Sequence, residues 1–146
     1  MKTAAKNDNA DLVNFCIHKG ADDFNGAMKL EAGGGYIKIV HLMTDHGAND
    51  FNEAMVRAAR GGHIDVVHLM IDHGTYDFNV AMVFAACCGH IDIVHLMIEH
   101  GVDGFNGTMV WAAAGEGHID IVRLMIDHGA NENAYEIVVN INDNKD

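Results

Sequence analysis

The sequence predicts an all-α solenoid in which short antiparallel helix pairs stack one after another. Phe-Asn pairs beginning at Phe24, Phe51, Phe78 and Phe105 recur every 27 residues, and a fixed period of this kind indicates a repeat architecture. Each period contains two segments with helical hydrophobic spacing, and glycines follow both. The 146 residues include 16 glycines and no proline. That composition suits uninterrupted helices with glycine at their ends.

The period divides the chain into one repeat domain with two incomplete end units. The first unit is truncated. Residues 11–21, "DLVNFCIHKGA", align with the second helical segment of a later unit, "DVVHLMIDHGT", and Met1 aligns with Met28, which lies inside the first helical segment of its unit. The last segment is predicted to hold a capping helix at "AYEIVVNI" and a tail, and polar caps of this kind close the open ends of a solenoid. The predicted units are 1–23 (truncated cap), 24–50, 51–77, 78–104 and 105–131 (full repeats), and 132–146 (C-terminal cap and tail).

The first helix of a unit is predicted at about 53–60 in the second full repeat. Asp50 or Asn52 is its candidate N-cap, because short polar side chains accept hydrogen bonds from the first N–H groups of a helix. Glycines at 61 and 62 permit a turn after it. One extra residue lies in "AAAGEGH" (112–118), and it indicates a turn, since an insertion within a helix would rotate its faces.

The second helix is predicted at 64–73. Asp65, His68 and Asp72 are spaced i, i+3, i+7 and form one solvent stripe, while apolar residues fill the other positions. That pattern suits a helix buried by neighbours on both sides. Asp65 lies in the first turn, where the helix dipole favours an acid, and Gly74 follows the last turn. A helix pair this short cannot bury its own apolar surface, so stacking is required.

The repeated unit resembles the ankyrin repeat. In "AARGGHIDVVHLMIDHG" an alanine pair, Gly-His, an acidic residue, aliphatic positions and a closing His-Gly follow in the ankyrin order, and the likeness covers roughly residues 1–140. The ankyrin period is about 33 with a Thr-Pro-Leu-His start, whereas the aligned residues here are "EAMV" at 53–56. The shortening, about six residues, falls where ankyrin repeats build a β-hairpin finger. The resemblance therefore implies short loops without a finger, with Phe51 and its equivalents packed against the core.

The resemblance also implies a protein–protein interaction module or scaffold without catalysis and without a cofactor. Ankyrin partners often contact the fingers and the groove face of the first helices, so a fingerless variant would rely on that face. No Gly-rich phosphate loop and no HExxH motif occurs in the sequence, so the residues offer no enzymatic alternative.

The copies within this chain differ along one face of the first helix. Positions 53, 57 and 60 change from unit to unit, and their spacing of i, i+4, i+7 places them together. The positions that barely change are Ala54, Met55, Ala58 and Ala59. We expect the constant positions to hold the units together and the variable positions to face outward.

The variable positions supply the candidate binding residues. Because stacked helices lie about 8–10 Å apart, one such position would form a row across the solenoid. Arginine and aromatic residues in a row are typical of binding hot spots. Relaxed drift on a solvent face, with the aromatic rings packed on adjacent helices, is the alternative. The predicted partner-binding residues are Leu30, Glu53, Arg57, Arg60, Val80, Phe84 and Trp111.

Composition bounds the partner and the compartment. The net charge of −12 argues against nucleic acid and predicts a basic protein surface as the partner. Cys16, Cys87 and Cys88 form no disulfide framework, which predicts a reducing, intracellular and cytoplasmic setting. The longest apolar runs are too short to cross a bilayer, so no membrane association is predicted. A monomer is expected, with self-association as an alternative.

Eleven histidines raise the question of a metal site. Within one helix, His68 and Asp72 are spaced i, i+4 and could hold a metal ion with solvent completing the shell. Repetition of the unit already accounts for the number of histidines, so no metal is predicted and a His-rich metal-binding protein is the weaker alternative. The vicinal pair Cys87 and Cys88 falls at a turn, where it could bind soft metals, respond to oxidation or simply fill the turn.

Overall fold

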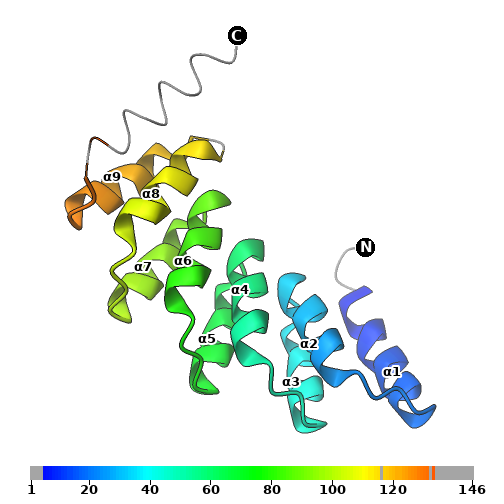
Figure 1. Ribbon diagram of the computed structural model, residues 1–146. Coiled ribbons are helices and arrows are strands. Elements are labelled where there is room, and N and C mark those ends of the chain that lie inside the picture. Colours follow the sequence, from blue (N-terminus) through cyan, green and yellow to red (C-terminus); the bar gives the residue numbers. More distant parts are fainter. Residues whose placement is uncertain (1–4, 116, 132, 134–146) are drawn as a thin grey trace.

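The computed structural model describes residues 5–115, 117–131 and 133, and within them nine helices and no strand occur. Figure 1 shows the helices stacked in chain order, with α1 at one end and α9 at the other. The bounds are α1 Ala5–His18, α2 Phe24–Gly33, α3 Ile37–Asp45, α4 Phe51–Gly61, α5 Ile64–Asp72, α6 Phe78–Cys87, α7 Ile91–Glu99, α8 Phe105–Ala114 and α9 Ile119–Asp127.

The helices form two layers, which confirms the predicted solenoid of stacked helix pairs. The first helices of the units, α2, α4, α6 and α8, pack side by side, and each also packs on its own second helix, α3, α5, α7 or α9 (Figure 1). The loops at 46–50, 73–77 and 100–104 contain no strand. The β-hairpin finger is therefore absent from these loops, as the 27-residue period predicts.

The core consists of the constant positions. Ala54, Met55, Ala58 and Ala59 of α4 are fully buried, and so are their equivalents in α6. Alanine lets neighbouring first helices approach closely, while the flexible methionines fill the remaining gaps. In the second helix, Asp65, His68 and Asp72 are exposed as predicted.

The described residues before α2 form one helix, α1, instead of a pair. In the repeat 51–77 the chain turns at Gly62, which has a φ of +75° in the left-handed region. The aligned position in the first unit carries Asp8, and the segment around it contains no glycine. The helix therefore continues through this position. Of the predicted C-terminal cap at 132–146, only residue 133 belongs to the described residues.

The prediction of the helix start is wrong in one respect. Helix α4 begins at Phe51, so Asn52 lies within it and is not the N-cap. Asp50 occupies the N-cap position, but its side chain makes no capping hydrogen bond. Its carboxylate instead pairs with Lys29 Nζ at 2.9 Å. Lys29 of α2 therefore engages the side chain that α4 alone would use as its cap, whereas Asp23 does cap α2 by accepting a hydrogen bond from the Gly26 N–H at 2.8 Å.

The asparagine after each phenylalanine ties its helix to the loop that leads into the next unit. Asn52 Oδ1 accepts a hydrogen bond from the Tyr76 N–H at 3.0 Å. Asn25 Oδ1 accepts two such bonds, from the N–H groups of residues 49 and 50. Asn79 and Asn106 make the equivalent contacts at 3.3 and 2.7 Å. These bonds satisfy loop N–H groups that have no β-hairpin partner.

Replacing Asn52 with alanine tests this role. We expect the Tyr76 amide hydrogen to exchange about tenfold faster, because it loses its acceptor. Hydrogen exchange followed by NMR measures this directly. The Asn52→Asp variant keeps an acceptor oxygen and should retain most of the protection. Equal exchange in wild type and Asn52→Ala would show that the bond does not hold the loop.

The phenylalanine that opens each first helix packs on the histidine that follows the second helix. Phe51 and His73 stack with ring centroids 4.5 Å apart and an interplanar angle of 9°. Phe78 and His100 stack in the same way at 4.7 Å, and the other two pairs are tilted. The four phenylalanines also pack against the buried core. The expected role of Phe51 is therefore confirmed, with a histidine on its outer side.

A second set of histidines joins consecutive units. Nε2 of His63 lies 3.1 Å from the carbonyl oxygen of Gly33, and Nε2 of His90 lies 3.0 Å from that of Arg60. By the repeat, His118 should reach the Cys87 carbonyl. Its Nε2 is instead buried without a hydrogen-bond partner among the described residues. This is the repeat that carries the additional residue in its turn, at 112–118.

Candidate functional site

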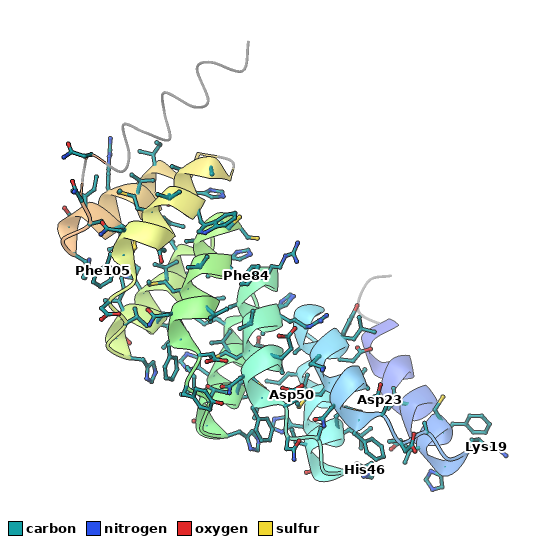
Figure 2. All side chains as sticks on the ribbon, in the orientation of Figure 1. Lys19, Asp23, His46, Asp50, Phe84 and Phe105 are labelled. Carbon is teal, nitrogen blue, oxygen red and sulfur yellow. The ribbon has the colours of Figure 1, made fainter. Side chains whose placement is uncertain are left out.

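The exposed surface of α2, α4, α6 and α8, here called the first-helix face, carries all seven predicted binding residues. Leu30 is 68% exposed, Trp111 54%, Val80 45% and Phe84 37%. Glu53, Arg57 and Arg60 are exposed as well. Neither aromatic ring is thus buried between helices. Figure 2 shows Phe84 at the edge of the array opposite Asp23, Asp50 and Phe105.

Two predicted residues of α4 form an ion pair with each other. Arg57 Nε donates to Glu53 Oε1 at 2.9 Å, across one helical turn. Both side chains are about half exposed, so the pair contributes little to stability. Its geometric effect is larger, because it fixes Arg57 while using only the Nε–H. The terminal nitrogens of the guanidinium remain as further donors.

Arg60 lies beside an aromatic ring and pairs with no carboxylate of the described residues. Its Cζ is 6.0 Å from the centre of the Phe84 ring, within the range of a cation–π contact. The contact joins α4 to α6. In the described part of the chain, no cation–π contact joins Trp111 to another of the predicted residues.

A groove between α2 and α4 completes the face, and it was not among the features predicted from the sequence. Its volume is about 660 Å³. It opens where α2 ends in Gly33, while the equivalent positions of later units carry Arg60, Cys87 and Ala114. The absence of a side chain at Gly33 is the sequence feature from which the groove could have been predicted. The groove is lined by Lys29, Leu30, Glu31, Gly33, Gly34, Tyr36, Arg57, Arg60 and Gly61.

The charged groups of the groove are mostly cationic. Arg57 and Arg60 stand on α4, and Lys29 stands on α2 with its ammonium paired to Asp50. Glu31 is the only acidic residue among those that line the groove. Burial raises the pKa of its carboxyl above the ordinary value, because desolvation disfavours the charged form. Three of the four charged side chains that line the groove are therefore cationic in a chain whose net charge is −12, and two of these three are paired with Asp50 and Glu53.

The histidines and cysteines form no metal centre in the part of the chain that the structure describes. There, no group of three or more His, Cys, Asp or Glu side chains is placed to hold an ion. His63 and His90 instead bridge units, and His73 and His100 stack on phenylalanines. Cys16, Cys87 and Cys88 are free thiols. Nor is any described helix long and apolar enough to cross a membrane.

Comparison with known families agrees with this architecture. The family model described as "Ankyrin repeats (3 copies)" matches residues 1–103 and 57–136, which together span most of the chain. The chain belongs to the ankyrin repeat family. A search of curated proteins finds no match. Ankyrin repeats are generally protein–protein interaction modules and are typically non-catalytic.

Proposed function

We propose that this ankyrin repeat protein is a non-catalytic interaction module that binds a partner protein through its first-helix face. One contrast carries the proposal. The constant residues Ala54, Met55, Ala58 and Ala59 are fully buried, while the variable positions of the same helices are mostly exposed and bear arginine and aromatic side chains. Variation is thus concentrated where it changes what the surface can bind and leaves the packing intact.

The chemistry of this face suits recognition of a protein. Trp111 and Phe84 present large apolar surfaces that a partner could desolvate, and arginine and tryptophan are enriched among residues that dominate binding energy. Four exposed apolar side chains, Leu30, Val80, Phe84 and Trp111, occur on this one face. The loops between units lack β-hairpins and offer little reach, so the helical face is left as the main surface.

Trp111 should be the strongest single contributor. We expect Trp111→Ala to weaken partner binding by about 1–4 kcal/mol while leaving the helical circular dichroism signal unchanged. Its 54% exposure means that the fold depends little on the ring. Tyr76→Ala is the matched control, because Tyr76 is also an exposed aromatic residue but lies in a loop. Equal affinity of Trp111→Ala and wild type would remove Trp111 from the site.

A pull-down from cell lysate tests the proposal as a whole. The wild type is compared with a triple variant, Arg57→Ala with Phe84→Ala and Trp111→Ala, after its helicity has been confirmed. A protein held by the wild type and lost by the variant supports the first-helix face. A protein retained equally by both would move the site to another surface, and retention of nothing by either would argue against a partner in that lysate.

Two related possibilities make different predictions. The basic partner predicted from the net charge would suit the exposed carboxylates of the second helices, such as Asp65 and Asp72, and it stays a prediction. Self-association is favoured by the exposed Leu30, Val80 and Trp111. Light scattering separates it from a foreign partner. A dimer that forms with rising concentration and disappears in Trp111→Ala would make a second copy the partner.

A further inference from the structure

Three of the four charged side chains that line the groove between α2 and α4 are cationic, although the chain as a whole is acidic. Arg57 and Arg60 stand one turn apart on α4 and both line the groove. Arg60 has no carboxylate partner among the described residues, and the ion pair of Arg57 occupies its Nε–H alone. A guanidinium group whose terminal N–H groups are not already used can donate two parallel hydrogen bonds to a carboxylate.

Apolar surfaces flank this cationic centre. Leu30, the most exposed aliphatic side chain of the first-helix face, stands on α2 at the wall of the groove. On the other side, Arg60 lies over Phe84 of α6, and Trp111 follows on α8. A ligand that crosses the first helices therefore meets an apolar, a cationic and then two aromatic positions in that order.

We propose that this groove binds an extended acidic segment of the partner, with one aspartate or glutamate held by Arg57 and Arg60 and apolar side chains on Leu30 and Phe84. The proposal rests on the proposed function and adds the chemistry of the partner. Because packed helices are about 8–10 Å apart and an extended chain in the polyproline II conformation advances about 3.1 Å per residue with three residues per turn, anchor positions on one face are about three residues apart. The expected motif is apolar-x-x-acidic-x-x-apolar, with a further apolar residue three positions beyond for Trp111.

The net charge of the protein restricts this ligand to a short acidic motif. A charge of −12 repels polyanions at long range, so electrostatic steering opposes their association. A segment with a single carboxylate is repelled much less than a polyanion, because the long-range repulsion grows with the charge of the ligand. Its attraction to the two guanidinium groups acts at contact distance. Asp50 and Glu53, which already pair with Lys29 and Arg57, further disfavour a second acid next to the first.

Selection from a random peptide library displayed on phage tests the proposal without knowledge of the natural partner. The full-length wild-type chain should enrich peptides that carry an acidic residue with apolar residues three positions away. The Arg57→Gln/Arg60→Gln variant should lose the acidic preference, and Arg123→Gln, which removes an exposed arginine of α9, should keep it. Enrichment of basic peptides, of apolar peptides without an acid, or of none would overturn the proposal.

Fluorescence anisotropy on a synthetic copy of the enriched peptide supplies the second measurement. Replacing its acid with the matching amide should weaken binding about tenfold to the wild type and leave binding to Arg57→Gln/Arg60→Gln nearly unchanged. Equal effects in both proteins would show that the acid does not contact these arginines. The difference should shrink in 0.5 M salt, because partly exposed charges are screened.

Gly33→Leu tests the groove itself without changing its charge. A Cβ at Gly33 would lie 3.6 Å from the Arg57 Cβ, which is ordinary contact, and the equivalent positions already carry side chains in Arg60 and Cys87. The variant should therefore fold while the leucine occupies part of the groove beside Arg57 and weakens peptide binding strongly. Unchanged peptide binding by a folded Gly33→Leu would place the ligand elsewhere.

The two proposals fail in different ways. If the first-helix face binds a partner but not through an acid, the protein captured from lysate will be lost by Trp111→Ala and retained by Arg57→Gln/Arg60→Gln. If the proposed function itself is wrong, both variants will retain whatever the wild type holds. A second copy of this chain as occupant would appear as a dimer that Gly33→Leu dissolves.

Discussion

Replacing Met82 with alanine is expected to lower the free energy of unfolding by about 2–5 kcal/mol, the largest stability effect predicted for a side-chain truncation in this protein. Met82 is fully buried on α6, between the units that precede and follow it. Truncation removes apolar contacts and leaves a cavity that the surrounding helices cannot close, because α6 is held by α4 on one side and α8 on the other. Urea unfolding followed by circular dichroism measures the change.

The repeat architecture makes the location of that loss informative. Each unit contacts mainly its neighbours, so weakening the middle of the array should uncouple the units on either side of α6. Hydrogen exchange should then show α8 and α9 opening more readily than α4. Met82→Leu, which conserves volume, should cost less than about 1.5 kcal/mol. An alanine variant within 0.5 kcal/mol of the wild type would contradict the packing described for this position.

Gly62→Ala is expected to cost about 2–4 kcal/mol, for two separable reasons. The φ of Gly62 is +75°, a conformation that alanine adopts only with strain. In addition, a Cβ there would lie 2.6 Å from the His90 ring, which would have to move and give up its contact with the Arg60 carbonyl. The second cost exists only because consecutive units pack this closely.

Gly74→Ala separates the two contributions. Gly74 has a similar φ of +85°, but a Cβ there would meet no atom within 4 Å. Its replacement should therefore cost only the backbone strain, about 1–2 kcal/mol. Adding His90→Ala to Gly62→Ala should remove the extra cost, so that the two substitutions are not additive. Equal destabilisation by Gly62→Ala and Gly74→Ala would show that His90 yields without cost.

The fold could be predicted from the sequence because the repeat displays each structural requirement several times. The 27-residue period, the alanine and methionine positions and the glycine-rich turns fix which residues are helical and which are buried. The shortened period alone excludes the β-hairpin fingers. Local patterns of this kind depend on residues within one helix or one turn, so they do not require knowledge of how the units pack.

Contacts between residues far apart in the sequence could not be predicted in the same way. Asn52 could be mistaken for a helix cap because its acceptor role depends on Tyr76, 24 residues away. His118 occupies the same repeat position as His63 and His90, yet its Nε2 has no hydrogen-bond partner among the described residues, and the repeat pattern does not predict this difference. Within the candidate site, the row of variable residues followed from helical spacing, but the groove depends on the absence of a side chain at Gly33 beside Arg57.

The central claim is that the first-helix face is the surface that meets the partner, and site-specific cross-linking tests it most directly. A photoreactive benzophenone amino acid is placed at position 84 on α6 or at position 95 on the exposed side of α7. Both proteins are irradiated with the partner obtained by pull-down. The account predicts a covalent adduct from position 84 and none from position 95. An adduct from position 95 alone, or from neither position, would contradict it.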